Sequence, residues 1–211
     1  MTHNAFKIRG FTLIELLVTM GVFTLVIVIA SGALFSAQAI NTRLEQTQTI
    51  LDGMNLTTEL VVRDIRYGSN FYCSSGSSVP TPVPTTRQDC PYSTGGGGGS
   101  VLVFRPTLAL SGSSDPTQDR VAYYVNNGTL YKNEYPSGGA VRTYQITTTD
   151  VNVSSLKFYA KGTKNSGDAS ADYNQPVITI AISGRTIPTK RTVQPITFNI
   201  ETTASTRTLD Q

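Results

Sequence analysis

The longest hydrophobic stretch of the chain runs from Leu16 to Phe35, twenty residues without a charge. At about 1.5 Å of rise per residue it predicts a helix about 30 Å long, the thickness of the hydrocarbon core of a bilayer. Lys7 and Arg9 precede this stretch. The positive-inside tendency therefore places the first residues in the cytoplasm and everything after Phe35 outside. The pattern predicts a single membrane crossing.

Beyond this stretch, apolar positions recur at alternating spacings of four and three residues, which predicts that the helix continues from Phe11 to about Arg66. The eight positions are Ile40, Leu44, Thr47, Leu51, Met54, Thr58, Val61 and Ile65, and all of them except the two threonines are apolar. Because they form one stripe, we expect the outer half of the helix to pack against a soluble domain. A free coiled coil is the weaker alternative, since the pattern lasts only about four heptads.

Arg63, Asp64 and Arg66 form a charge cluster where this helix is predicted to end. Charged side chains at a helix terminus are usually hydrated. We therefore interpret the cluster as a solvated helix end, with a docking site as the alternative.

Seven later segments have the composition of β-strands, several of them with apolar residues at alternate positions. They are Val101–Arg105, Arg120–Asn126, Thr129–Glu134, Val141–Thr148, Val153–Ala160, Val177–Ser183 and Ile196–Thr202. Asn127-Gly128 predicts a tight hairpin between two of them. Pro195 favours an edge position for the last one. The predicted fold class is α+β, a long N-terminal membrane-spanning helix packed by its outer half against an antiparallel β-sheet domain.

The segment between helix and strands lacks periodicity. Ser74 to Thr86 is rich in serine, threonine and proline, and Gly95 to Gly99 is a run of five glycines without the lysine and hydroxyl residue of a phosphate-binding loop. We interpret both as irregular connections. The predicted organisation is a cytoplasmic leader (1–10), a transmembrane and assembly helix (11–40), the outer half of the helix (41–67), a disulfide-tied irregular loop (68–100) and an antiparallel β domain (101–211).

Cys73 and Cys90 are the only two cysteines, and the predicted topology places both outside the cytoplasm, where disulfides form. We expect a disulfide between them; two buried free thiols are the alternative. A zinc site is a poorer hypothesis, because His3 is the only histidine and two cysteines cannot complete a tetrahedral shell.

Charge argues against nucleic acid as a general partner. Lysine and arginine total 17 and acidic residues 14, a net charge of +3. Without Lys7 and Arg9 the counts become 15 and 14, or +1, whereas phosphate-backbone binding needs clustered basic charge. Lys157, Lys161 and Lys164 are the best candidates for a basic stripe, and a solvated face is the simpler interpretation.

Glu15 lies at the cytoplasmic end of the apolar helix. A carboxylate that enters hydrocarbon unpaired costs a few kcal/mol, so an acid in this position suggests a function. The next basic residue is Arg43. A cleavable secretory signal does not fit, because the one convincing small residue at a junction, Gly10, comes before the apolar stretch. The remaining partner for Glu15 is an α-amino group at Phe11, its own or that of a neighbouring helix.

Gly10-Phe11-Thr12-Leu13-Ile14-Glu15-Leu16-Leu17 closely resembles the class III signal of type IV prepilins and type II secretion pseudopilins. The resemblance implies that a prepilin peptidase cuts between Gly10 and Phe11 and N-methylates Phe11. It also implies that Glu15 pairs with the amino terminus of a neighbouring subunit during filament assembly. A plain single-pass anchor is the alternative.

Two further stretches are similar to J-type minor pseudopilins and PilW-like minor pilins. They are the tyrosine-rich hairpin Val121–Lys132 and the helix end Leu60–Arg66. This resemblance implies a minor subunit at or near the tip of a type IV pilus or secretion pseudopilus. Its implied partners are other pilin or pseudopilin subunits, the prepilin peptidase, the inner-membrane assembly platform and membrane lipid.

Catalytic chemistry has little support in the sequence. His3 would be lost with the leader, which leaves no imidazole base for a nucleophile, so we expect no enzyme activity and no cofactor. Asp115 with Asp119, and Asp168 with Asp172, are possible calcium ligands, although polar loop residues are the better interpretation. A DNA-uptake or adhesion receptor and, less favourably, a membrane-anchored enzyme remain as alternative functions.

Overall fold

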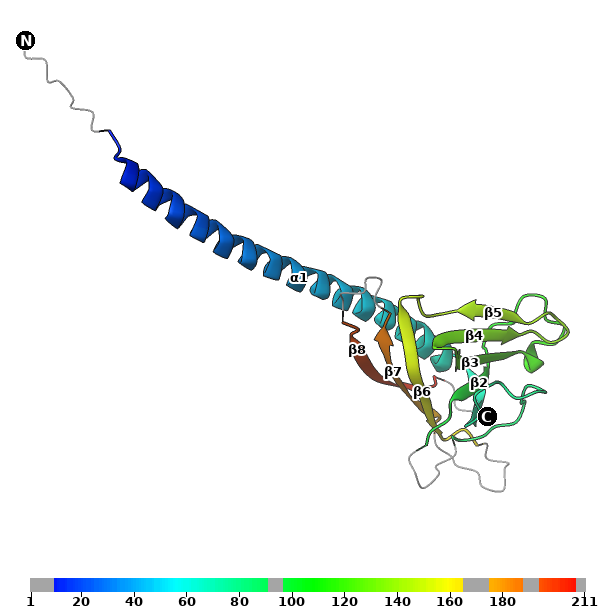
Figure 1. Cartoon of the computed structure of the whole chain (residues 1–211). Helices are drawn as coiled ribbons and strands as arrows, with labels where there is room; N and C mark the ends of the chain where they lie inside the picture. Colours follow the sequence, from blue (N-terminus) through cyan, green and yellow to red (C-terminus); the bar gives the residue numbers. More distant parts are fainter. Residues whose placement is uncertain (1–9, 91–96, 165–174, 188–193, 208–211) are drawn as a thin grey trace, which may run out of the picture. The chain divides into compact units, whose positions relative to one another are not determined.

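The structure is a computed structural model that describes residues 10–90, 97–164, 175–187 and 194–207. One long helix, α1 (Leu13–Arg66), is followed by antiparallel β-sheets, as predicted (Figure 1). Residues up to Thr47 and residues from Gln48 onward form two compact units. Most of the predicted leader, residues 1–9, lies outside the described residues.

In the first unit, every described side chain from Gly10 to Glu45 is exposed. The most apolar part of α1 is long enough to cross a membrane. Large side chains such as Phe11 and Val28 are 80% and 70% exposed. Such a surface is stable in lipid rather than in water, which supports a single-pass membrane anchor.

In the second unit, the outer part of α1 packs against the sheets along only part of the predicted stripe, at Met54, Val61 and Ile65. The buried positions of the helix are Ile50, Met54, Thr57, Val61 and Ile65. Leu51 is 48% exposed and Thr58 is only partly buried, so the prediction for these two was wrong. Alternating spacings of four and three average 3.5 residues, whereas a straight helix has 3.6 per turn, and the stripe therefore drifts around the helix.

The larger sheet has the order β1-β2-β3-β4-β5, all antiparallel. Its strands are β1 (Ser69–Ser74), β2 (Val101–Arg105), β3 (Arg120–Asn126), β4 (Thr129–Tyr135) and β5 (Arg142–Gln145). The β3–β4 hairpin turns at Asn127 and Gly128, both with positive φ (49° and 78°). This confirms the predicted turn, because both central positions of a tight hairpin favour residues that tolerate such angles.

Strand β1 corrects the prediction of an irregular segment from residue 68 to 100. Only six residues long, it buries Phe71 and Cys73 and pairs with β2. The alternation of buried and partly buried side chains in β1 covers only a few residues. The sequence pattern therefore did not distinguish this strand from the neighbouring loop. Gly99 is also fixed, because its N–H and C=O both bond to Phe158 at 2.7 Å. A Cβ there would lie 2.1 Å from the Cys73 sulfur, which explains the glycine. Gly95 and Gly96 lie outside the described residues.

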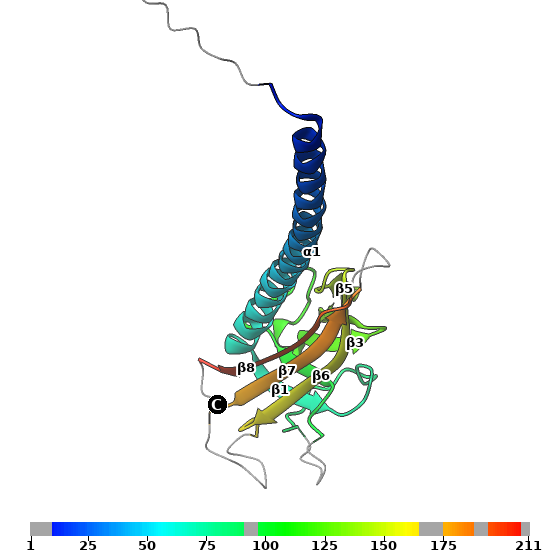
Figure 2. The ribbon, with the colours of Figure 1, turned by 60° about the vertical axis from the view of Figure 1, so that its left-hand side comes forward.

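The smaller sheet has the order β6-β7-β8 (Figure 2). Its strands are β6 (Val151–Lys161), β7 (Val177–Thr186) and β8 (Thr197–Ser205). β8 is an edge strand that begins two residues after Pro195, as predicted. Ile178, Ile180 and Ile182 of β7 join the same hydrophobic core as α1 and the larger sheet. The helix therefore covers an apolar face that two sheets share.

Cys73 and Cys90 form a disulfide with a Cα–Cα distance of 4.8 Å, which confirms the predicted pairing. The bond ties β1 to a segment held to β6 by the Cys90 N–H bond to Ala160 O, at 3.1 Å. The two cysteines are 17 residues apart, and closing such a loop removes about 3 kcal/mol of unfolded-state entropy.

We expect a Cys73→Ala/Cys90→Ala chain to melt roughly 10 °C lower than the parent, because the unfolded chain regains that entropy. Thermal unfolding of the detergent-solubilised full chain, followed by near-ultraviolet circular dichroism, measures the shift. Ser75→Ala in the same loop is the control and should melt like the parent. Equal melting of the double variant and the parent would contradict the expectation.

Candidate functional site

The segment that carries the predicted processing residues forms the start of α1. Gly10 and Phe11 are exposed and precede the first turn. The N–H of Glu15 donates to Thr12 Oγ1 at 3.4 Å, and the N–H of Leu16 donates to Thr12 O at 3.2 Å. Thr12 therefore caps the helix. Thr12 had no predicted role, although the Thr-x-x-Glu spacing is that of a capping box.

Glu15 lies in the first turn of α1, where the partial positive charge of the helix N-terminus favours a carboxylate. It is exposed, and within the described residues no ion pair includes it. The side chains around it in the sequence are large and apolar, with Ile14 and Leu16 70% and 52% exposed. The chain thus presents one carboxylate within a surface suited to lipid.

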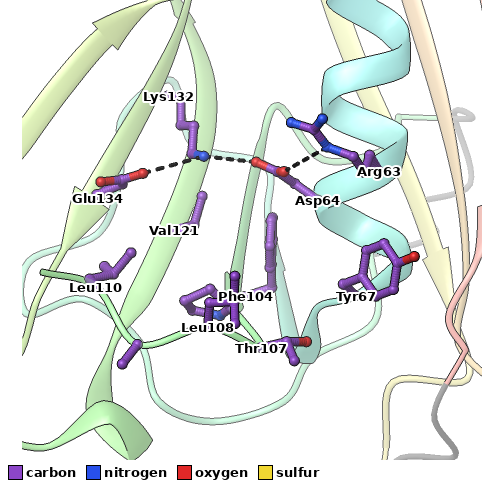
Figure 3. A pocket seen from close by; sticks show the side chains of 12 residues that line it. Arg63, Asp64, Tyr67, Phe104, Thr107, Leu108, Leu110, Val121, Lys132 and Glu134 are labelled. Carbon is purple, nitrogen blue, oxygen red and sulfur yellow. Dashed lines mark hydrogen bonds and ion pairs between the residues drawn. The ribbon is translucent and has the colours of Figure 1, made fainter.

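The C-terminal end of α1 carries a second cluster of polar and charged groups, which was predicted to be a solvated helix end. Asp64 Oδ2 accepts a hydrogen bond from Tyr123 Oη at 2.8 Å. The same oxygen pairs with Lys132 Nζ, also at 2.8 Å (Figure 3). Asp64 therefore connects the helix to β3 and β4. The interpretation of a solvated cluster was wrong for Asp64 and holds for exposed Arg63 and Arg66, because the partners of Asp64 are far away in sequence.

A series of ion pairs extends from Lys132 along the sheet. Lys132 Nζ lies 3.3 Å from Glu134 Oε1, and Arg142 lies 3.7 Å from Glu134 Oε2. Burial lowers the pKa of Lys132, but the hydrogen bond and charge of Asp64 outweigh it, so the net pKa is raised. Burial, with the charge of Asp64, raises the pKa of Tyr123. Lys132 therefore stays protonated and Tyr123 stays neutral in this network.

A cavity of about 630 Å³ lies beside this network. Its walls come from the end of α1, from β2, β3 and β4, and from the loop after β2 (Figure 3). The residues that line it are Arg63, Asp64, Tyr67, Phe104, Pro106, Thr107, Leu108, Ala109, Leu110, Val121, Lys132 and Glu134. Apolar walls with a few charged groups are typical of binding sites.

The predicted calcium ligands have structural roles where they are described. Asp115 caps a short 3₁₀ turn, because its Oδ1 accepts a hydrogen bond from the Thr117 N–H. Asp119 is fully buried and accepts bonds from Leu110 N, Ser113 Oγ and Ser137 N. Burial would raise the pKa of Asp119, but these bonds lower it. Within the described residues no acidic cluster suited to a metal occurs. Asp168 and Asp172 lie outside them.

The candidate basic stripe does not form a uniformly positive face. Lys157 lies on β6 in register with Ala181 of β7, and Ala181 is in register with Glu201 of β8. Lys157 and Glu201 line the same shallow hollow of about 360 Å³. Lys161 and Lys164 both have interaction partners of their own. The balance of charge on this face favours a solvated surface.

Residues 6–31 match the family model described as "Prokaryotic N-terminal methylation motif". The match includes Gly10, Phe11 and Glu15 and ends within the apolar part of α1. No curated protein and no solved structure matches the chain.

The motif and the architecture agree on one class of protein. The motif is the class III prepilin signal, and it supports the superfamily of type IV pilins and pseudopilins. One long apolar N-terminal helix followed by antiparallel sheets is a pilin-like architecture. Together they support a subunit that is processed by prepilin peptidase and assembles with other pilin subunits, and they point to a structural subunit rather than an enzyme.

Proposed function

We propose that this chain is a minor pilin or pseudopilin that assembles through α1 into a type IV pilus or a type II secretion pseudopilus, at or near its tip. The observation that carries the proposal is the match of residues 6–31 to the methylation motif, at the start of an apolar helix long enough to cross a membrane. The J-type and PilW-like minor subunits are the subgroup that we favour.

In this proposal the peptidase cuts between Gly10 and Phe11 and methylates the new amino terminus. Both residues precede the helix and are exposed, so the bond lies outside regular structure. The cut leaves a cationic amine at Phe11, four residues before Glu15, the carboxylate in the first turn of α1. In a dry environment unlike charges attract strongly, and a neighbouring subunit's amine is a suitable partner for Glu15.

The second unit then faces the extracytoplasmic side, as Lys7 and Arg9 at the start of the chain suggest. The disulfide between Cys73 and Cys90 is consistent with that side, because disulfides persist in oxidising compartments. The inner membrane, its assembly platform and its lipids are the surroundings in which the unassembled subunit would reside.

A receptor for DNA or for a surface ligand is the second candidate within the same pilin frame. It would need a basic or otherwise specialised face on the second unit. Glu201 beside Lys157 disfavours DNA, and we rank the structural subunit first.

The test of the proposal is the mass of the chain recovered from the membranes and sheared filaments of cells with active prepilin peptidase. We expect a chain that begins at N-methylated Phe11 in both fractions. Cells without the peptidase are the control, and their chain should keep residues 1–10. A full-length chain in cells with the peptidase, or its absence from the filament fraction, would refute the proposal.

A further inference from the structure

The smaller sheet ends in β8, whose outer edge has no partner strand within the described residues (Figure 2). β8 is nine residues long and pairs with β7 without a register shift. An edge strand of this length presents a row of backbone N–H and C=O groups that can pair with another chain. β8 contains neither proline nor lysine, the residues that commonly protect such an edge.

The other edges of the two sheets are short or covered. β5 has only four residues. The edge of β1 is bonded to the loop that follows it, because the Cys73 N–H donates to Gln88 O and the Gln88 N–H donates to Phe71 O. The edge of β6 exchanges two bonds of 2.7 Å between Phe158 and Gly99. β8 is therefore the long open edge that the described part of the chain presents.

The hydrogen bonds just beyond the two ends of β8 show which of its backbone groups point outward. The Thr186 N–H donates to Ile196 O at 2.9 Å, and the Thr206 N–H donates to Pro176 O at 3.2 Å. Because successive residues of an antiparallel strand bond in alternate directions, the even-numbered residues of β8 bond to β7. The odd-numbered residues direct their N–H and C=O groups to the open edge, and all of them are exposed: Thr197, Asn199, Glu201, Thr203 and Ser205.

The two faces of β8 define what an added strand should carry. On the face toward the core, Phe198 is 8% exposed and Ile200 is partly buried, so apolar residues are suited to the positions beside them. Glu201 is exposed on the other face, and within the described residues no ion pair includes it. Its neighbour on β7 is the uncharged Ala181, and Lys157 lies one strand further away. A cation opposite Glu201 on an added strand would lie closer, with the Cβ atoms about 5 Å apart.

We propose that the open edge of β8 receives an extended segment of a different subunit, which pairs with it as a fourth strand of the smaller sheet. The segment alternates apolar and polar residues and carries a lysine or arginine opposite Glu201. In this mode of binding the main-chain bonds supply affinity and the alternate side chains supply specificity. A second β8 does not meet these requirements, because β8 has no basic residue.

The inference rests on the proposed function, because assembly into a filament brings different subunits side by side. It adds a contact of the second unit, whereas the methylation motif lies in residues 6–31. One open edge accepts one strand of a different subunit, so the contact does not propagate from copy to copy. Such a contact suits a minor subunit at or near the tip.

The experiment places a photo-activated cross-linking amino acid at Asn199, Thr203 or Ser205 of separate full-length chains. Each chain is expressed in its own cells and recovered from sheared filaments, and mass spectrometry identifies the residue to which it is joined. We expect all three positions to join one segment of a different subunit. The joined residues should be four apart for Asn199 and Thr203 and two apart for Thr203 and Ser205, because paired strands keep a fixed register. Thr143, exposed on the short edge strand β5, is the control and should give no such series.

Two substitutions test the charge and the backbone separately, with the cross-linker at Asn199. Glu201→Lys should lower the yield of the cross-link by roughly fivefold or more, and replacement of the opposite basic residue by glutamate should restore most of it. Thr203→Pro removes an N–H that points to the open edge and none that bonds to β7, so it should lower the yield too. Asp150→Lys, exposed in the turn before β6, is the control and should leave the yield unchanged.

Cross-links without a common register, cross-links only to a second copy of this chain, or a yield that Glu201→Lys does not change overturn the strand addition. A missing cross-link in chains that begin at Phe11 and enter filaments overturns it while the proposed function stands. Chains that retain residues 1–10 overturn the proposed function and, with it, the assembly that brings the subunits together.

Discussion

A Gly10→Leu chain stays in the membrane with residues 1–10 still attached. Gly10 precedes α1, and a Cβ at this position meets no atom of the chain within 4 Å. The substitution therefore leaves the fold alone and changes only what the peptidase binds. We expect at least about tenfold less processed chain, which corresponds to ~1.4 kcal/mol of lost transition-state stabilisation.

Intact-mass measurement of the membrane fraction, sampled over time after synthesis, gives the processed share. Gly21→Ala is the matched control, because its Cβ also meets nothing within 4 Å and it lies beyond the cleavage point, so that chain should be processed like the parent. Normal cleavage of the Gly10→Leu chain would show that Gly10 is not the processing residue.

Local patterns predicted those parts of the fold that depend on neighbours in sequence. The apolar stretch and its continuation predicted α1 to within two residues at its start, and Asn127-Gly128 predicted the β3–β4 hairpin because the turn needs positive φ at both positions. Val101–Arg105 and Arg120–Asn126 were predicted with the bounds that the strands have. Each of these signals is contained within the element that it describes.

Features that depend on residues distant in the sequence could not be predicted from local patterns. Whether Asp64 is solvated is decided by Tyr123 and Lys132, which lie 59 and 68 residues away. β1 is a strand because β2 pairs with it across the disulfide-tied loop. The choice of Ile50 over Leu51 for the core depends on the rotation of the helix against the sheets, and a spacing rule fixes that rotation only approximately.

The residues of the candidate site also differ in whether the sequence alone could reveal them. Gly10, Phe11 and Glu15 form one short motif, so a reader of the sequence could find them together. The cavity is lined by residues from position 63 to position 134, and only the fold brings them together.

Replacement of Glu15 by glutamine leaves a subunit that folds and is processed but enters filaments poorly. Every described side chain from Gly10 to Glu45 is exposed in its unit, so Glu15 makes no contribution to the fold of the second unit. The disulfide and the melting temperature should therefore match those of the parent. The loss arises in the filament, where the low dielectric strengthens the attraction between Glu15 and a neighbouring amine and makes either charge costly without the other.

The same pairing fixes the axial position of one helix against the next, because a displaced helix would leave both charges unpaired. We expect at least about tenfold less Glu15→Gln chain in sheared filaments. A tenfold change corresponds to ~1.4 kcal/mol in the free energy of assembly. Quantitative mass spectrometry of the filament and membrane fractions measures the ratio. Glu15→Asp keeps the charge on a shorter side chain and should recover part of the loss, while Asp150→Asn in the turn before β6 serves as the exposed-acid control. If Glu15→Gln chain enters filaments as well as the parent does, the carboxylate has no part in assembly.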